Sequence, residues 1–333
     1  MLPIRLLNLG LIPPLQTQAV YHALAERISA DEQDAIILCR PNAPYLCLGY
    51  HQPFDSVFDA EECRRRRLPV LRRRLGGGAT YLDENQVFYQ CVFHHSRMPA
   101  MLKDIYRAAL SAPVNALKRL GLNAELREVN EIEVNGRRIA GTGGGRIDEA
   151  CVVVGNLLFD FDFEAMTSVW KTPSASFRAL AEKALRERLV TLNQLGVTTS
   201  RKTIEEMLVE EFSKSFGREI KMDSLTAEEL EHVQMMEKEL ISREFLLLHK
   251  GQSESIRPLK ISARAYVYAD EMQLDGFKLN GSFLVSQNVI QEAILESEPA
   301  SNWSFLQEQL RGASFQKWQE KVHAHFYNEI ILS

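Results

Sequence analysis

The 333-residue chain contains no apolar run that approaches ~20 residues, the length needed to cross a membrane as a helix, so no membrane span is expected. Its first residues lack a basic leader followed by an apolar core and a cleavage site, so no secretory signal is expected. The net charge of −5 gives no overall attraction to nucleic acid or to an anionic membrane. These absences predict a cytoplasmic protein whose partners are neither nucleic acids nor membranes.

Cysteine is scarce, and its pattern argues against both disulfide bonds and a zinc site. The chain has no Cys-x-x-Cys spacing and no pair of histidines at the three-to-five-residue spacing of zinc-finger ligands. Its five cysteines are odd in number and scattered: Cys39, Cys47, Cys63, Cys91 and Cys151. This pattern indicates reduced thiols and argues against a zinc site.

The most distinctive stretch runs from Leu71 to Tyr81, where three arginines precede three consecutive glycines and strand-like patterns lie on either side. Glycines allow bare backbone N–H groups to approach an anion, and arginines are forked donors that suit phosphate or carboxylate. A flexible hairpin beside a solvated basic patch fits the composition equally well. Neither a P-loop nor a dinucleotide-binding turn is indicated, because no Gly-Lys-Ser/Thr follows and the next element is a strand.

A second informative stretch reads as a hairpin that leads into more glycines. Residues Asn130–Val134 alternate as a strand does, Asn135-Gly136 is a strong two-residue turn signal, and Arg137–Gly141 returns. Thr142–Gly145 is predicted as another bare-backbone loop, and Cys151–Phe159 as a buried strand.

The remaining pattern divides the chain in two. The first part of the chain has the periodicity of amphipathic helices. The predicted helices are Thr17–Ile28, Met101–Leu120 with a kink or break at Pro113, segments between Phe163 and Leu189, Ser200–Phe216, and one that begins at Thr226. After Ser242 the pattern changes to strands, with hairpin turns at Asp275-Gly276 and Asn280-Gly281, and two helices close the chain. We therefore predict one domain over 1–242 and a small accessory domain over 243–333.

Three motifs, in order, resemble those of the lipoate-protein ligase A family within the biotin/lipoate protein ligase superfamily. The first is Arg72-Arg73-x-x-Gly76-Gly77-Gly78-Ala79-x-Tyr81-x-Asp83. The hairpin Asn130–Gly141 is similar to the family's Asn-Asp-Ile-x-x-x-Gly-x-Lys-Ile-x-Gly, and Gly155–Leu158 to its His-Gly-x-Leu-Leu. The resemblance implies an α+β fold with a mixed/antiparallel sheet flanked by helices, as in biotin/lipoate ligases, followed by a small C-terminal α+β domain.

The resemblance also implies a reaction and a set of site residues. Lipoate or octanoate would be activated with ATP and Mg²⁺ to an acyl-adenylate and then transferred to a lysine of a lipoyl carrier domain, of the 2-oxoacid dehydrogenase E2 or glycine-cleavage H type. Glu131 would hold the metal, and the acyl chain would lie against Tyr81, Val87 and Leu157. The residues implied to bind lipoate or the adenylate are Arg73, Gly76, Gly77, Gly78, Ala79, Tyr81, Asp83, Asn130, Gly141, Gly155 and Leu157.

The chain departs from the family pattern at the position of the family's lysine, which is Arg138 here. Arginine keeps the positive charge but is longer and planar. We therefore expect it to place that charge less accurately in the transition state than lysine does. Arg138 is the candidate catalytic cation, and Lys171, at the end of a short helix that follows in the sequence, is the candidate lysine that would take over its role.

Three functions therefore stay open. The first is an ATP-dependent lipoate-protein ligase, the second a lipoyl-adenylate or lipoyl-protein binding module without adenylation activity, and the third a transferase that takes octanoyl or lipoyl groups from a carrier. Transferases that use a cysteine place it just upstream of the second motif, and residues 124–129 contain none, so a thioester mechanism is disfavoured.

Overall fold

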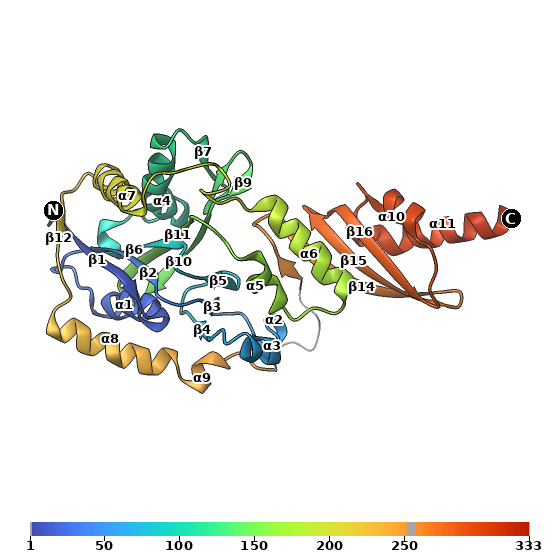
Figure 1. Cartoon of the computed structure of the whole chain (residues 1–333), viewed down its shortest axis with the longest axis horizontal. Helices are drawn as coiled ribbons and strands as arrows, with labels where there is room; N and C mark the ends of the chain where they lie inside the picture. The colour runs from blue at the N-terminus through green and yellow to red at the C-terminus, as the bar shows by residue number, and fades with distance from the viewer. Residues whose placement is uncertain (1, 252–257, 333) are drawn as a thin grey trace.

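A computed structural model describes residues 2–251 and 258–332. The chain forms a larger N-terminal unit around a six-stranded mixed sheet and a smaller C-terminal unit around a four-stranded antiparallel sheet, which extends away to one side (Figure 1). This arrangement confirms the predicted α+β class with a sheet flanked by helices.

The central sheet has the strand order β10-β11-β6-β2-β1-β12. Strand β1 pairs in parallel with β2 and β12, whereas the pairs β2–β6, β6–β11 and β11–β10 are antiparallel. All nine residues of β6 are buried, which explains why its sequence is an almost continuous apolar and aromatic run. The strands are β1 (Ile4–Ile12), β2 (Ala35–Pro41), β6 (Gln86–His94), β10 (Ala140–Ile147), β11 (Ala150–Leu158) and β12 (Ile220–Met222).

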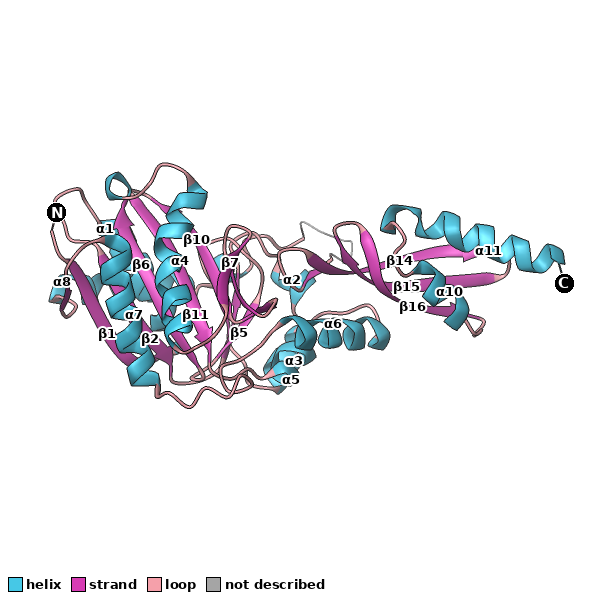
Figure 2. Cartoon of the chain, turned by 90° about the horizontal axis from the view of Figure 1, so that it is seen from above, coloured by secondary structure: helices cyan, strands magenta, loops and turns pink. Residues whose placement is uncertain are grey.

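Two layers of helices cover this sheet (Figures 1 and 2). Helices α4 (Leu102–Arg119) and α7 (Arg201–Phe216) pack on one face, and α1 (Pro14–Arg27) and α8 (Ala227–Leu240) on the other. Local signals set their ends: the Ser200 hydroxyl caps α7, and Thr226 begins α8 with a reciprocal capping box. Pro113 lies inside α4, which continues through it.

Small sheets and short helices surround one end of the central sheet. Strands β4 and β5 both pair with β3, so the glycine segment connects two strands that flank a third. In the β7-β8-β9 sheet, Asn135 and Gly136 have φ of +52° and +76°, which confirms the predicted turn. These elements are β3 (Tyr45–Leu48), β4 (Val70–Arg72), β5 (Thr80–Leu82), β7 (Ala124–Arg127), β8 (Glu131–Val134), β9 (Arg137–Arg138), α2 (Phe54–Val57), α3 (Ala60–Arg65) and α5 (Phe163–Ser168). The 3-10 helix η1 (His95–Arg97) follows β6 at the other end of that strand.

Two glycine-containing stretches differ from their predicted structure. Thr142–Gly145 is part of β10, paired residue by residue with β11, so the prediction of a loop is wrong. The composition misleads because Gly144 serves close packing rather than a loop: a Cβ there would lie 2.8 Å from the Val152 carbonyl oxygen. The turn predicted at Asn280-Gly281 is also wrong, since both residues lie inside β15, where a Cβ at Gly281 would meet the Phe283 ring at 2.3 Å.

The C-terminal unit packs its sheet against two helices around the buried Trp318 and Phe283. The predicted Asp275-Gly276 hairpin turn is confirmed. The opposite face of the sheet docks on helix α6 (Ala175–Arg188) of the first unit, where Lys183 also pairs with Glu292 at 2.7 Å. The unit comprises β13 (Leu259–Lys260), β14 (Ala265–Leu274), β15 (Phe277–Ser286), β16 (Val289–Glu298), α10 (Ser304–Leu310), η2 (Phe315–Lys317) and α11 (Trp318–Leu332).

The segment just after residue 242 contacts the first unit. Helix α9 (Arg243–Leu246) lies beside β4, and the buried Arg72 guanidinium donates to the carbonyl oxygens of Phe245 (2.8 Å) and Leu246 (2.7 Å). The domain division at 242 stays a prediction, but these contacts tie residues 243–246 to the N-terminal unit. Among the described residues, no helix has both the length and the apolar character needed to cross a membrane.

Candidate functional site

A cavity of about 190 Å³ lies where the glycine segment after β4, the β8–β9 hairpin and the start of β10 meet. Helix α1, strands β3, β5, β6 and β11, and strand β13 of the C-terminal unit complete its walls. The walls therefore combine bare backbone with side chains that come from both units.

The structure brings nine of the predicted site residues together in this cavity. They are spread over more than eighty positions of the sequence, and the fold of the central sheet collects them. These residues are Arg73, Gly77, Gly78, Ala79, Asn130, Glu131, Arg138, Gly141 and Gly155.

Five other predicted residues lie outside the cavity lining. Lys171 donates from its Nζ to the Asp55 carbonyl oxygen at 2.7 Å, beside helix α2. Asp83 is buried, accepts the Asn85 backbone N–H at 2.9 Å, and has its pKa raised by burial. Gly76, Tyr81 and Leu157 are likewise absent from the lining.

The alternation of strand side chains explains the placement of Tyr81. Thr80 and Leu82 line the cavity, so Tyr81 between them points to the opposite face and packs in the cluster with Phe163. The same alternation places Phe88 and Val154 at the cavity in place of Val87 and Leu157. The apolar wall is thus Leu82, Phe88 and Val154, each an odd number of positions from the predicted residue on its strand and therefore on the opposite face.

Arg73 organises the glycine segment. Its Nη2 donates to the carbonyl oxygens of Gly76 and Gly78, both at 2.9 Å, and its Nη1 lies 3.5 Å from the Cys47 sulfur. Gly77 has φ +104°, and a Cβ there would lie 2.7 Å from Arg73 Nη2. A Cβ at Gly49 would in turn lie 2.0 Å from the Gly77 carbonyl oxygen. The backbone is therefore wrapped around a guanidinium in a way that only glycine permits.

The two neighbouring arginines have different tasks. Arg72 donates to the carbonyl oxygens of Tyr50 (2.6 Å) and Gln52 (2.8 Å) as well as to α9, and burial lowers its pKa. The Arg74 side chain pairs with Glu239 at 2.5 Å at the surface. The run of three arginines is thus an internal brace, a cavity residue and a surface residue in turn.

The β8–β9 hairpin contributes the charged pair of the cavity. The Arg138 Nη1 lies 3.8 Å from Glu131 Oε1, and the same oxygen accepts the Ala263 backbone N–H at 2.7 Å. Burial lowers the pKa of Arg138, while the carboxylates of Glu131 and Glu133 oppose that change. Because an arginine side chain is effectively always protonated in proteins, Arg138 is a cation in the cavity.

Several lining residues escaped the sequence analysis. Gln90 and Asn156 are buried polar residues inside apolar strands, a pattern that signals a functional or bridging role. Cys47 and the α1 residues Gln18 and Tyr21 also line the cavity, and no local motif marks them. The last is Lys260, which belongs to the C-terminal unit.

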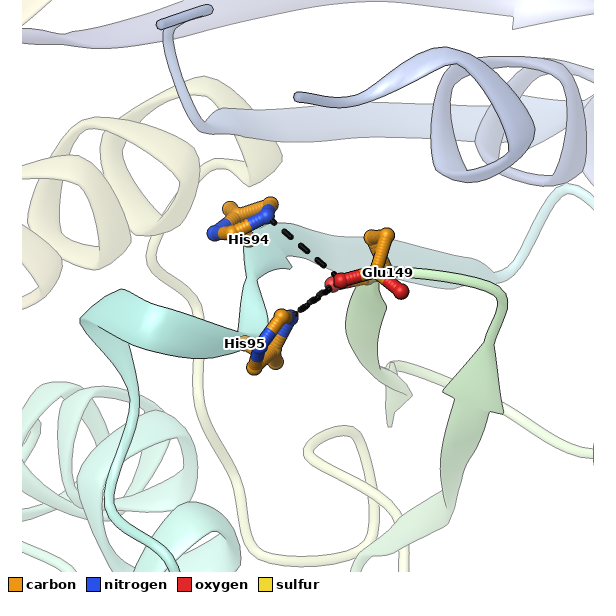
Figure 3. A group of neighbouring side chains, drawn as sticks. All are labelled: His94, His95 and Glu149. Atoms are coloured by element: carbon orange, nitrogen blue, oxygen red, sulfur yellow. Dashed lines mark hydrogen bonds and ion pairs between the residues drawn. The ribbon is translucent and has the colours of Figure 1, made fainter. Parts of the chain in front are cut away.

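One group of three potential metal ligands occurs in the described part of the chain, and it lies away from the cavity. His94, His95 and Glu149 meet where β6 ends beside the β10–β11 turn (Figure 3). His94 is four residues beyond the cavity residue Gln90 along β6, which corresponds to roughly 13 Å. Glu149 Oε2 lies 2.9 Å from His95 Nδ1, and His94 Nδ1 lies 2.7 Å from the Ser96 hydroxyl, so hydrogen bonds account for this geometry.

Comparison with known proteins places these observations in a family. Residues 13–213 match the family described as the lipoyl protein ligase A/B catalytic domain. The octanoyltransferase LipM of Kyrpidia tusciae is 28% identical over 218 residues, which cover 58% of this chain and 79% of that protein.

Solved structures show the same fold. An archaeal bipartite lipoate protein ligase from Thermoplasma acidophilum, studied with its E2 lipoyl domain, has a TM-score of 0.69 at 22% identity and covers 74% of this chain and 97% of its own. A lipoate-protein ligase A bound with ATP has a TM-score of 0.64 at 22% identity and covers 74% of this chain and 99% of its own. Because the family match spans more than half of the sequence, this chain belongs to the lipoyl protein ligase A/B catalytic domain family.

Proposed function

We propose that this protein is an ATP-dependent lipoate-protein ligase that joins lipoate or octanoate to a lysine of a lipoyl carrier domain. The observation that carries the proposal is the charge of the cavity: three cations, Arg73, Arg138 and Lys260, line it with one carboxylate, Glu131. Bare backbone from two glycine-rich segments and polar side chains such as Gln90 and Asn156 complete the polar wall. Such a site suits a ligand that presents a carboxylate and phosphates.

The reaction has two steps. A carboxylate oxygen of the acid attacks the α-phosphorus of ATP, and pyrophosphate leaves. The neutral amine of the acceptor lysine then attacks the acyl carbon, AMP leaves, and the amine nitrogen loses a proton. Both steps build negative charge near the acyl phosphate, and fixed cations such as Arg138 stabilise that charge in a partly buried site. The apolar wall of Leu82, Phe88 and Val154 would hold the acyl chain.

The donor set fits a Mg²⁺ ion that arrives with the nucleotide. Glu131 is the carboxylate of the cavity, and its Oε1 is already taken by the Ala263 N–H. Mg²⁺ in such sites needs only one or two carboxylates, because substrate phosphates and water supply the other oxygens. Glu131 would therefore hold the ion through its second oxygen, and the bound ion would neutralise phosphate charge during adenylation.

A transferase is the second candidate, and Cys47 favours it, because this residue gives the cavity a thiol that residues 124–129 do not supply. This thiol lines the cavity 3.5 Å from Arg73 Nη1, which opposes the rise in thiol pKa that burial causes. The octanoyltransferase relative also supports this alternative. In that reaction the Cys47 thiolate would attack the thioester of an acyl carrier, the carrier thiol would leave, and the acceptor amine would then displace Cys47.

One experiment separates the two reactions. An unmodified lipoyl domain is incubated with the protein and either lipoate with Mg-ATP, octanoate with Mg-ATP, or an octanoyl thioester of a carrier protein without ATP, and intact masses are measured. The ligase requires acylation with a free acid, dependent on ATP and accompanied by AMP. Acylation from the thioester alone, lost in Cys47→Ala, would favour the transferase. If the protein binds lipoyl-adenylate but acylates with no donor, the binding-module interpretation stands and the ligase is excluded.

Variants of Arg138 test the role of the cavity cation. If arginine holds the charge slightly out of place, Arg138→Lys will raise the single-turnover rate of lipoylation, and Arg138→Ala will abolish it. Lys171→Ala is the matched control, since Lys171 lies outside the cavity lining and contacts the Asp55 carbonyl. A loss of activity in Lys171→Ala, with Arg138→Lys unchanged, would move the catalytic role to Lys171.

A further inference from the structure

The three cations of the cavity are not equally available to a ligand. Arg73 already donates to the carbonyl oxygens of Gly76 and Gly78, and Arg138 lies beside Glu131. Lys260 is exposed at the cavity, and within the described residues its amine has no hydrogen-bond or ion-pair partner. Lys260 is therefore the cavity cation that is most available to bind a ligand, because Arg73 and Arg138 already contact protein groups.

The position of Lys260 follows from the strand that carries it. Its neighbour Ile261 is 1% exposed and packs with Phe177 of α6, so the alternate side chain, Lys260, points to the other face. A tight turn then returns the chain, with the backbone N–H groups of Ile261 and Ser262 both donating to the Ala265 carbonyl. Burial on one side and a turn on the other hold the backbone of β13 at the cavity.

Two contacts tie this turn to the β8–β9 hairpin of the first unit and to the residues just before it. The Ala263 N–H donates to Glu131 Oε1 at 2.7 Å, and Arg264 pairs with Glu128. Glu131 thus connects the C-terminal unit to the element that also carries Arg138. Although β13 belongs to the second unit, the position of its turn relative to the first unit is held by Glu131, the carboxylate that also lines the cavity.

We propose that Lys260 contacts the anionic acyl phosphate of the bound acyl-adenylate, so that the C-terminal unit completes the site. The inference rests on the proposed function, and it adds a specific cation from outside the matched catalytic domain. A lysine suits this position because its compact charge sits on a flexible stem and can follow a ligand as charge develops. The neighbouring guanidiniums are fixed by their partners and cannot.

Binding of a non-hydrolysable lipoyl-adenylate analogue, the acyl sulfamate of adenosine, tests the proposal by calorimetry on the full chain. Lys260→Ala should bind the analogue about 10-fold more weakly, because a charge-assisted contact is lost. Lys260→Arg should keep most of the affinity, and the difference between wild type and Lys260→Ala should shrink at high salt. Since Lys260 is exposed, its removal should leave the melting temperature unchanged, which confirms that the variant is folded.

Lys278→Ala is the matched control, because Lys278 is an exposed lysine of the same unit that pairs with Glu271 rather than lining the cavity. Its affinity for the analogue should equal that of the wild type. If the wild type binds the analogue and Lys260→Ala binds it equally well, the role of Lys260 is excluded while the ligase proposal stands. If the wild type does not bind the analogue, both proposals fall.

Discussion

The two glycine-rich segments that wall the cavity have similar compositions and opposite structures. Residues 76–78 form a loop in which Gly77 has φ +104° and the carbonyl oxygens of Gly76 and Gly78 accept from Arg73. Residues 143–145 form the middle of strand β10, paired with β11 throughout. In the first segment glycine permits a positive φ that other residues rarely adopt. In the second segment the lack of a side chain leaves room for atoms of Val152 and Tyr106.

The difference shows what holds each wall in place. The loop depends on polar donors, chiefly the guanidiniums of Arg72 and Arg73 that bind backbone carbonyls around it. The strand depends on packing, because Tyr106 and the Val152 carbonyl occupy the volume that a Cβ at Gly144 would need. Substitutions should therefore destabilise the strand through steric overlap and the loop through lost hydrogen bonds.

The largest effect is expected in the strand. In Gly144→Ala the new Cβ would meet the Val152 carbonyl oxygen at 2.8 Å and the Tyr106 hydroxyl at 2.9 Å, so the free energy of unfolding should fall by about 2 kcal/mol or more. The control is Gly143→Ala one residue away, where the nearest atom is 3.6 Å distant and the change should stay below about 0.5 kcal/mol. Urea unfolding of both variants measures the difference, and equal stabilities would show that packing does not hold this wall.

A comparable effect on stability is expected from the hydrogen bonds between Arg72, just before the glycine loop, and helix α9. The fragment 1–242 lacks the Phe245 and Leu246 carbonyls that accept from Arg72, whereas 1–250 keeps them. Because hydrogen bonds to a charged group are worth about 1.5–3 kcal/mol, 1–250 should be more stable to urea by about 2 kcal/mol. Both fragments should still bind the adenylate analogue, about 10-fold more weakly than the full chain, because Lys260 is the one lining residue that they lack. An unfolded 1–242, or a folded fragment without affinity, would contradict the domain division at 242.

The next effect concerns ligand affinity rather than stability. Arg73→Ala removes the donor that shapes the glycine loop, so the affinity for lipoyl-adenylate should weaken by more than ~1.5 kcal/mol. Arg74→Ala is the control, because its side chain forms surface ion pairs with Glu26 and Glu239 that are worth little. Gly77→Val should weaken affinity further, since its φ of +104° strains any branched residue. Calorimetry that finds Arg73→Ala unchanged would remove Arg73 from the site.

The contrast between the segments also shows which features a sequence reveals. Helix caps at Ser200 and Thr226 and the Asn135-Gly136 turn are local signals, and each appears where expected. The structure of residues 142–145 is decided by Tyr106 and Val152, which lie elsewhere in the chain. Glycine composition alone therefore cannot distinguish a bare loop from a crowded strand.

Two further differences have the same origin in tertiary structure. Whether Tyr81 or its neighbours face the cavity depends on strand parity, and a shift of one residue exchanges the two faces. Lys260 reaches the cavity only because β13 docks beside α6, more than a hundred residues after Arg138 in sequence. The motif residues of the cavity were accessible from the sequence, whereas the side chains that complete its walls required the fold.

The smallest effect expected is a loss of stability in acid that arises from His22, which contacts the residue just before the glycine loop. His22 is buried, its Nδ1 donates to the Gln18 carbonyl at 2.6 Å, and its Nε2 accepts the Arg74 N–H just before the glycines at 3.0 Å. Burial lowers the pKa of His22 from 6.5 to about 3. The unfolded chain therefore binds a proton between these values that the folded chain does not, so stability is complete above pH 6.5 and is lost as the pH falls toward about 3.

Between about pH 7.5 and pH 5.5 this linkage should lower the free energy of unfolding by about 1 kcal/mol. Strand residues 142–145 carry no titratable side chain, so the acid effect belongs to the loop side of the cavity. Urea unfolding of wild type and His22→Asn at both pH values provides the measurement. The variant should be less stable at either pH because it loses a buried hydrogen-bonded ring, but its stability should depend less on pH, by the amount that the titration of His22 supplied. An identical pH dependence in both proteins would show that His22 titrates alike in the folded and unfolded chains, and that the hydrogen bond to Arg74 does not couple the loop to pH.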